Sequence, residues 1–328
     1  MRQIVECVPN FSEGRDLSVL GAIVMAISEV PGVKCLNAEP NKDYHRSVVT
    51  FVGPPDAVVE GAFEGTKKAT ALIDMRMHKG GHPRMGAVDV VPFVPVSGVT
   101  MNDCVALAET FGDRVGRELQ LPVFLYEAAA KHPDRRNLSV VRKGEYEGLE
   151  EKLKDSRWCP DYGPAVFNAQ SGAVITGARM FLIAYNVNLA AADLHAANEI
   201  AARIRESGRT KKGEKQAIPG SLKSVKAMGV LLEGKNIAQV SMNLVDFSVT
   251  PPHIAFEEVK REAASLGIEV TGSEIVGLVP KEALLKAGRF YAPAETQEDS
   301  LIRVAMDHLG LGDLEPFDAG KKVIEYQL

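Results

Sequence analysis

The segment of residues 78–86 has the residue types of a catalytic loop. It reads HKGGHPRMG and combines two imidazoles with a lysine, an arginine, three glycines and a proline. Glycine permits unusual backbone angles and close ligand approach, and proline fixes a turn. On such a loop His78 or His82 could transfer protons near neutral pH, while Lys79 and Arg84 attract an anionic substrate. A structural turn whose histidines cap backbone groups explains the same pattern, and the residues alone leave both interpretations open.

Metal and phosphate chemistry fit this segment poorly. The two histidines are four residues apart, but Gly80, Gly81 and Pro83 prevent the helix that would pair them, and the glutamate of a metalloprotease motif is missing. Lys79 and the glycines suggest a phosphate loop, yet the P-loop spacing is absent and a strand, rather than a helix, follows. We therefore expect no metal site, and proton transfer by an imidazole is the favoured chemistry.

Length and composition are those of a globular protein with two domains. The chain has 328 residues, and single cores stop growing near roughly 250–300 residues. Its net charge of −5 argues against a surface that binds nucleic acid. The four cysteines have no paired spacing, which indicates reduced thiols in a cytoplasmic protein. The apolar run at 4–8 is too short for a signal peptide, and no run reaches the roughly 20 residues of a membrane span, so we expect no membrane partner.

Strands and helices alternate in both halves of the chain. Apolar patterns in the first half predict strands at 4–8, 33–36, 47–52, 88–96 and 123–126, and helices at 17–27, 55–72 and 101–119. The second half repeats this order, with predicted strands at 180–187, 227–232, 238–247 and 268–278 and predicted helices at 190–204 and 251–266.

The repeated order predicts the fold. Pro54-Pro55 and Pro251-Pro252 open a helix at equivalent points of the two halves, because proline suits the first helical turn. We therefore expect an α/β (α+β) protein of two βαββαβ-type subdomains, with the sheets facing each other and the helices outside. The predicted subdomains are residues 1–178 and 179–328. Ligand sites commonly lie at such an interface, so a groove between the sheets is the expected place for a site.

Three segments lack a regular apolar pattern. Residues 131–142 are rich in lysine and arginine and predict a solvated surface helix or loop. Residues 158–164 are aromatic and turn-rich and lead through 168–171 to Gly172 and Gly177. This stretch suits a domain linker, or a wall of the groove on which Trp158 grips a flat ring. Residues 209–215 are basic and predict an exposed loop.

Four motifs carry a resemblance to a known family. They are VECVPNFSEG at 5–14, RS at 46–47 with TFVG at 50–53, the 78–86 segment continued through Asp89 to Pro95, and DYGP at 161–164 continued to Leu189. On these motifs the chain resembles the glutamate formiminotransferases, which form the amino-terminal part of formiminotransferase-cyclodeaminase. The resemblance covers essentially the full chain.

The resemblance implies a fold, an activity and a set of site residues. It implies two α/β subdomains around a tunnel, and transfer of a formimino group between N-formimino-L-glutamate and tetrahydrofolate, the co-substrate, in histidine degradation. By motif position the catalytic histidine is His82. The family also suggests a homodimer. Its folate-binding segment falls on Gly163, Pro164, Ala165, Val166, Phe167, Asn168, Ala169, Gln170, Ser171 and Gly172.

The implied reaction explains the residue types near His82. A base must take a proton from the attacking nitrogen and an acid must protonate the leaving nitrogen; one imidazole can do both, for roughly 10²–10⁴ in rate. We expect a carboxylate partner that orients His82 and raises its pKa, and Glu39 is the candidate. Arg46 and Arg84 are candidate clamps for a carboxylate of glutamate or of the folate tail. Each of these three residues equally suits a surface ion pair.

Other functions stay open at the level of sequence. The alternatives are transfer to glycine, use of 5-formyltetrahydrofolate, and a non-catalytic folate-binding protein. The last is motivated by departures from the family's pattern at Gly81, at His45 and at 168–171. The chain ends at Leu328, so we expect a separate cyclodeaminase to process the folate product.

Overall fold

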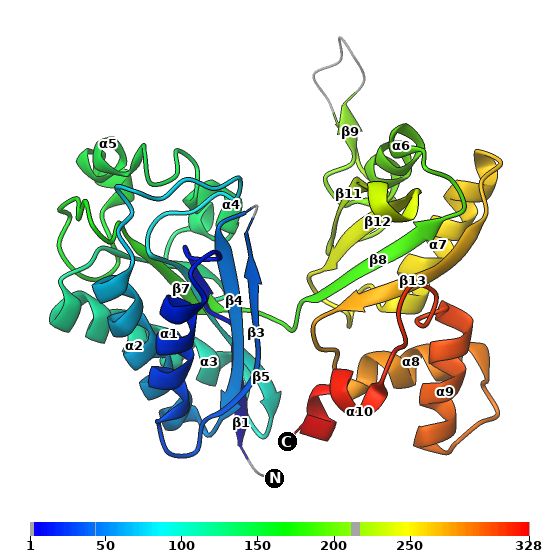
Figure 1. The fold of residues 1–328 in the computed structure, drawn as a ribbon, viewed down its shortest axis with the longest axis horizontal. Coiled ribbons are helices and arrows are strands. Elements are labelled where there is room, and N and C mark those ends of the chain that lie inside the picture. The colour runs from blue at the N-terminus through cyan, green and yellow to red at the C-terminus, as the bar shows by residue number, and fades with distance from the viewer. Residues whose placement is uncertain (1–2, 43, 211–216, 328) are drawn as a thin grey trace. The chain divides into compact units, whose positions relative to one another are not determined.

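The structure, a computed structural model, describes residues 3–42, 44–210 and 217–327. The chain divides into two compact units, Met1–Met180 and Phe181–Leu328 (Figure 1). Each unit is described by itself. Within the described residues, no helix combines the length and the apolar character needed to cross a membrane.

Unit 1 is built on one mixed sheet with helices against it. Its strands are β1 (Ile4–Cys7), β2 (Asn10–Phe11), β3 (Lys34–Asn41), β4 (Arg46–Gly53), β5 (Val88–Ser97), β6 (Val123–Glu127) and β7 (Val174–Ala178). Its helices are α1 (Leu17–Ser28), α2 (Pro55–Leu72), α3 (Met101–Arg114), α4 (Leu138–Val141) and α5 (Leu149–Lys154), with a π-helical turn η1 (Val115–Leu119) and 3₁₀ turns η2 (Pro133–Arg135) and η3 (Ser156–Trp158).

The strand order of unit 1 contains the predicted βαββαβ arrangement. The strands β3, β4, β1 and β5 lie side by side in that order and pair antiparallel, with the short β2 also pairing to β4 and β5. Beyond β5 the sheet continues through β7 to β6, and these pairs are parallel. The parallel extension joins the 160–178 region to the strand that follows the histidine loop.

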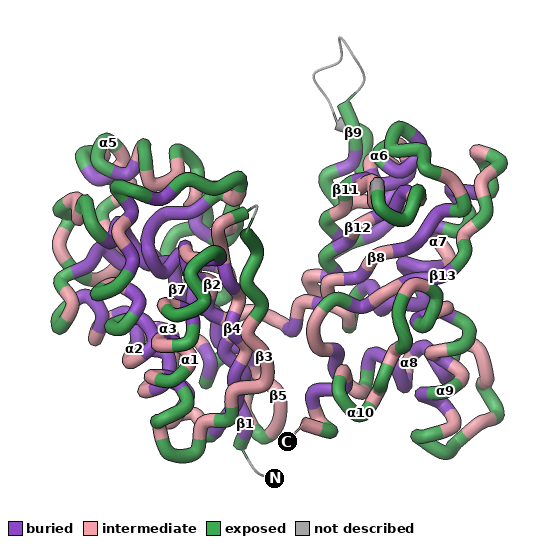
Figure 2. Tube along the Cα trace, viewed as in Figure 1, coloured by how far each residue is buried: buried purple, intermediate pink, exposed green. Residues whose placement is uncertain are grey.

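Both faces of the sheet are covered where β5, β7 and β6 lie. Most residues of these strands are buried, as Figure 2 shows at β7, and the apolar ones divide between two clusters. Val123 and Leu125 pack in the cluster with α1, α2 and α3, whereas Phe124 and Tyr126 pack in the cluster with Leu149 and the rest of the 138–158 region. A strand covered on both faces loses the simple apolar and polar alternation, which explains its continuous apolar sequence.

Unit 2 repeats the arrangement. Its strands are β8 (Ile183–Leu189), β9 (Arg209–Thr210), β10 (Ala217–Ile218), β11 (Val225–Leu232), β12 (Ile237–Leu244) and β13 (Val270–Val276), and its helices are α6 (Leu194–Ile204), α7 (Pro252–Ser265), α8 (Lys281–Tyr291), α9 (Glu298–Leu309) and α10 (Ala319–Lys322), with 3₁₀ turns η4 (Glu233–Lys235) and η5 (Ile324–Gln327). The strands β11, β12, β8 and β13 form an antiparallel sheet in that order. This order matches β3-β4-β1-β5 element by element, so the prediction of two βαββαβ units is confirmed.

The structure corrects several local predictions. The strand β7 was not predicted, because Val174–Ala178 lies in a segment interpreted as a linker. The helix predicted at 101–119 ends as an α-helix at Arg114 and continues as the π-helical η1. The predicted strand at 180–187 is displaced to Ile183–Leu189. Of the predicted basic loop, residues 211–215 lie outside the described residues.

The prediction of a solvated segment at 131–142 is wrong for Arg135, although most residues of the segment are exposed. Arg135 is 1% exposed and forms an ion pair of 2.6 Å with Asp161. Its guanidinium also donates to the carbonyls of Arg157 and Cys159. The charged residues of the segment predict exposure to solvent. A guanidinium with this many hydrogen-bond acceptors can nevertheless be buried.

Candidate active site

The histidine loop runs between α2 and β5 and is fixed by backbone hydrogen bonds to residues 170–173. Met75 N donates to the carbonyl of Gln170 at 2.8 Å, and Ala87 N donates to that of Ser171 at 2.9 Å. Gly86 bridges Gly172 in an antiparallel pair. A Cβ on Gly86 would collide with the Ser171 and Ala173 backbone, so only glycine permits this approach. The last residues of the predicted folate segment therefore lie directly against the loop that carries His82.

His82 contacts Arg46, the first residue of β4. The Nη1 of Arg46 donates to Nε2 of His82 at 2.5 Å. Guanidinium nitrogens carry only donors, so Nε2 is the unprotonated nitrogen and the imidazole in this contact is neutral. The ring of Tyr44 meets the imidazole edge-on, with ring centroids 6.1 Å apart. Of the two residues predicted to act with His82, the structure thus brings Arg46 into contact.

The surroundings of His82 favour its neutral form. Burial, together with the positive charges of Arg46 and Arg142, lowers the pKa of His82 to about 4. This direction is opposite to the one expected from a carboxylate partner. The candidate partner, Glu39, lies on the exposed strand β3, where its Oε1 accepts a hydrogen bond of 2.6 Å from Asn37. The catalytic roles of His82, Arg46 and Glu39 stay predictions.

A buried carboxylate beside this pair was missed by the sequence reasoning. Asp89 is 1% exposed, and its Oδ1 accepts from Met85 N at 3.0 Å and from Arg142 Nε at 3.2 Å. Its Oδ2 accepts from Nη2 of Arg142. The signal was present, because Asp89 is the one charged residue in the apolar run 88–96. A charge in a buried strand needs a partner, and here the partner comes from the end of α4.

His78, the second histidine of the loop, has a positioning role. Its Nε2 donates to the carbonyl of His45 at 2.8 Å, and its Nδ1 accepts from Nε of Arg84 at 3.1 Å. Its ring stacks on that of His45, with centroids 4.4 Å apart. Burial is the main cause that lowers the pKa of His78. The ring therefore ties the loop to the start of β4, where Arg46 follows His45.

Arg84 differs from the expected carboxylate clamp. It is 6% exposed and forms ion pairs with Glu145 at 3.0 Å and with Glu147 at 2.5 Å. Two carboxylates already match its single positive charge. A substrate carboxylate would have to displace one of them. Arg46, in contrast, has no ion-pair partner among the described residues.

The predicted folate segment meets the histidine loop at its carboxyl-terminal end. Gly163 and Gly172 at its two ends have positive φ angles of 74° and 69°. Tyr146 holds the middle of the segment, because its hydroxyl donates to the carbonyl of Ala169 at 2.5 Å and its ring packs on Phe167. A pocket of about 330 Å³ borders the segment and is lined by Lys67, Thr70, Ala71, Leu119, Leu121, Asn168, Gln170 and Ser171. The binding role of the segment stays a prediction.

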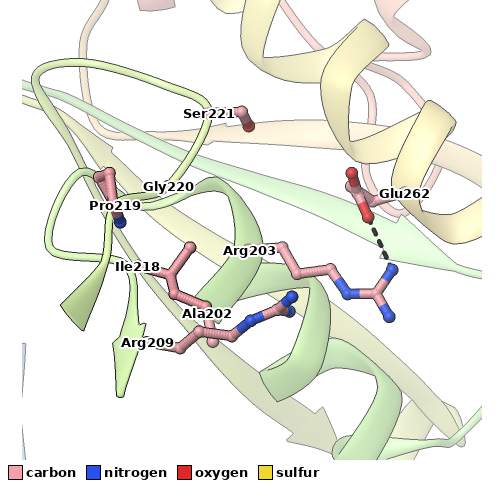
Figure 3. Close-up of a pocket in the computed structure, with 8 residues that line it drawn as sticks. All are labelled: Ala202, Arg203, Arg209, Ile218, Pro219, Gly220, Ser221 and Glu262. Carbon is pink, nitrogen blue, oxygen red and sulfur yellow. Dashed lines mark hydrogen bonds and ion pairs between the residues drawn. The ribbon is translucent and has the colours of Figure 1, made fainter. Parts of the chain in front are cut away.

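Trp158 and a pocket in unit 2 lie among residues that pack or pair with one another. Trp158 packs edge-on against Phe124, with centroids 6.2 Å apart, and so contributes to a core cluster of unit 1. A pocket of about 360 Å³ in unit 2 contains Arg203 beside Glu262 (Figure 3). These two side chains form an ion pair of 2.8 Å. Within the described residues, no group of three or more His, Cys, Asp or Glu is placed to hold a metal ion.

Comparison with known families matches both units. The formiminotransferase domain, N-terminal subdomain, matches residues 4–179, and the formiminotransferase domain matches residues 184–328. The chain therefore belongs to the formiminotransferase family.

Some similar proteins have about the length of this chain, and others are considerably longer. The glutamate formimidoyltransferase of Streptococcus pyogenes serotype M1 is 43% identical over 90% of this chain and 95% of that protein. The glutamate formimidoyltransferase of Thermoplasma acidophilum is 46% identical over 88% of this chain and 92% of that protein. The formimidoyltransferase-cyclodeaminase of Rattus norvegicus is 51% identical over 99% of this chain. The chain spans 60% of the length of this rat relative.

Proposed function

We propose that this protein is a glutamate formimidoyltransferase, which moves the formimino group of N-formimino-L-glutamate to N5 of tetrahydrofolate. The observation that carries the proposal is a neutral imidazole, His82, held by Arg46 on a loop that also contacts the 163–172 segment. Relatives that this chain matches over more than nine tenths of their length bear the same name.

The proposed reaction exchanges one carbon–nitrogen bond for another. N5 of tetrahydrofolate attacks the amidine carbon, and His82 accepts the N5 proton as the new bond forms. The tetrahedral intermediate then breaks its bond to the glutamate nitrogen, and His82 returns the proton to that leaving nitrogen. The products are 5-formiminotetrahydrofolate and L-glutamate. Holding both substrates against one loop supplies the proximity that a bimolecular reaction lacks.

A direct assay tests this function. Purified protein is incubated with N-formimino-L-glutamate and tetrahydrofolate, and the absorbance of the folate product is followed. We expect transfer in the unaltered protein and a loss of at least about 100-fold in His82→Ala, because the proton carrier is gone. His132→Ala, which alters an exposed histidine, serves as the matched control.

The outcomes separate the alternatives. Folate binding without product formation would show a binding protein instead of an enzyme. Near-normal turnover of His82→Ala would refute the role of His82. In a competition at saturating folate, preference for N-formiminoglycine over N-formimino-L-glutamate would show that glycine is the natural amino acid.

We also propose a cellular setting for the reaction. The family resemblance supports a homodimer that acts in histidine degradation, and the free cysteines support a location in the cytoplasm. Light scattering of the purified protein measures its mass and so tests the homodimer. A mass equal to that of one chain would contradict the homodimer.

A further inference from the structure

The basic nitrogen of His82 is covered in this structure. A neutral imidazole has one nitrogen that can accept a proton, and here that nitrogen is Nε2. Nη1 of Arg46 donates to it at 2.5 Å. The other nitrogen, Nδ1, carries the proton and is buried without a hydrogen-bond partner among the described residues. While Arg46 stays in place, a proton on Nε2 would face an N–H of a cation, so His82 cannot act as a base.

The guanidinium of Arg46 is held by little else. Its Nε is buried without a hydrogen-bond partner within the described part of the chain. Burial lowers the pKa of Arg46, which shows that its charge is poorly solvated, and the nearby charge of Asp89 only partly offsets this effect. A half-buried guanidinium without a direct carboxylate partner is a strong receptor for a ligand carboxylate.

The neighbouring carboxylate is already committed. Both oxygens of Asp89 accept hydrogen bonds from Arg142, and Oδ1 also accepts from Met85 N. Asp89 therefore neutralises Arg142 rather than Arg46. The charged groups facing His82 are Arg46 from β4 and Arg142 from the end of α4, with Asp89 of β5 behind them and the ring of Tyr44 at the edge. The local excess is one positive charge.

We propose that Arg46 is a cap on His82 that the substrate removes: a carboxylate of the bound amino-acid substrate takes the Arg46 guanidinium and thereby frees Nε2 of His82. The identity of that carboxylate, on N-formimino-L-glutamate or L-glutamate, rests on the proposed function. The freed Nε2 accepts the N5 proton of tetrahydrofolate, and the imidazolium then gives it to the leaving glutamate nitrogen. The base becomes available only when an acidic substrate is present.

The cap also contributes to the low pKa of His82. With Arg46 against Nε2, the pKa of His82 is about 4, too low for efficient proton transfer at neutral pH. A carboxylate that binds Arg46 cancels one of the two charges that lower this pKa and places a negative charge near the ring. Both effects raise the pKa of His82 toward neutrality.

The full-length protein labelled at histidine ¹³Cε1 tests the cap by NMR titration. Comparison with the spectrum of His82→Gln assigns the signal of His82 among those of the seven histidines. We expect a saturating concentration of L-glutamate to raise the apparent pKa of His82 by at least about one unit, a tenfold change in proton affinity. The diamide of L-glutamate, which has no carboxylate, should leave it unchanged.

Two variants complete the test. Arg46→Met removes the cap, so His82 should titrate at higher pH without ligand and should no longer respond to L-glutamate. Arg117→Met alters an exposed arginine and should behave as the unaltered protein does. An unaltered protein whose His82 titrates identically with and without L-glutamate would overturn the proposal, and so would an Arg46→Met protein that still responds. The titration needs no turnover, so a cap without transfer activity would refute only the proposed function, and transfer without a cap only this inference.

Discussion

At the scale of single residues, hydrogen-bond partners distinguish two histidines that look equivalent in the sequence. His78 and His82 lie on the same loop, yet His78 has both nitrogens satisfied by His45 and Arg84. His82 has one nitrogen capped by Arg46 and the other without a partner among the described residues. A ring whose hydrogen bonds are complete is suited to hold structure, and a ring with one nitrogen unpaired within the described residues is suited to react.

Gly81 offers a test of the electrostatics around His82. A Cβ at Gly81 would meet only Cδ1 of Tyr44, at an ordinary contact distance of 3.7 Å, so a side chain fits here. We expect Gly81→Glu to raise the pKa of His82 above its value in Gly81→Gln, because a carboxylate beside the ring favours the imidazolium. The same ¹³C titration measures it. Equal pKa values in the two variants would show that a charge at residue 81 does not affect the pKa of His82.

At the scale of elements, the site depends on close backbone contact between two segments. The loop before β5 and the segment before β7 meet at Gly86 and Gly172, and β5 and β7 then pair in parallel. The same pairing that builds the sheet therefore sets the distance between the histidine loop and the predicted folate segment. The strand β7, which the sequence pattern did not reveal, is what aligns them.

Gly86→Ala tests this contact. Its methyl group would overlap the backbone of Ser171 and Ala173, so we expect unit 1 to lose roughly 1–3 kcal/mol in its free energy of unfolding. Tetrahydrofolate affinity should fall as the two segments separate. Urea unfolding followed by the fluorescence of Trp158, the only tryptophan of the chain, reports on unit 1.

Gly81→Ala is the matched control, since it makes the same change in the same loop at an open position. Similar unfolding midpoints for Gly86→Ala and Gly81→Ala would contradict the importance of the contact.

At the scale of the whole molecule, the two units share a strand order and differ in what they carry. Unit 1 has the histidine loop and the extension through β7 and β6. Unit 2 has a buried histidine of its own, His253 on α7, which is 6% exposed and stacks on Phe290. Both units therefore contain imidazoles that burial keeps neutral.

These histidines predict how stability depends on pH. Burial is the first cause that lowers the pKa of His78, and it lowers the pKa values of His82 and His253 to about 4. In the unfolded chain a histidine has a pKa of about 6.5. Between these values the unfolded chain binds more protons, so the free energy of unfolding should fall as the pH is lowered from about 6.5 to about 4. Urea unfolding at several pH values, followed by circular dichroism, measures this loss.

His253→Leu assigns the part that belongs to unit 2. We expect this variant to lose less stability on acidification by circular dichroism, whereas the transition seen by Trp158 in unit 1 should keep its acid sensitivity. An acid response that is identical in the variant and the unaltered protein would contradict a contribution from His253.

Several features followed from the sequence because they depend on neighbours in the chain. The apolar spacing and the Pro-Pro helix starts predicted two βαββαβ units, and the strand orders confirm them. Glycine and proline content placed the histidine loop, and motif position selected His82. The facing of the two sheets, the roles of the site residues and the folate segment stay predictions.

The tertiary structure alone decided which charges meet the imidazole. The Arg46–His82 contact joins residues 36 apart, and the Arg142–Asp89 pair joins residues 53 apart. The expected carboxylate on β3 was replaced by a guanidinium on β4, and a segment thought to be solvated supplied Arg142 and the buried Arg135. The physical reason is that local patterns fix elements, whereas contacts between distant residues depend on strand order and register, which form only when the elements pack.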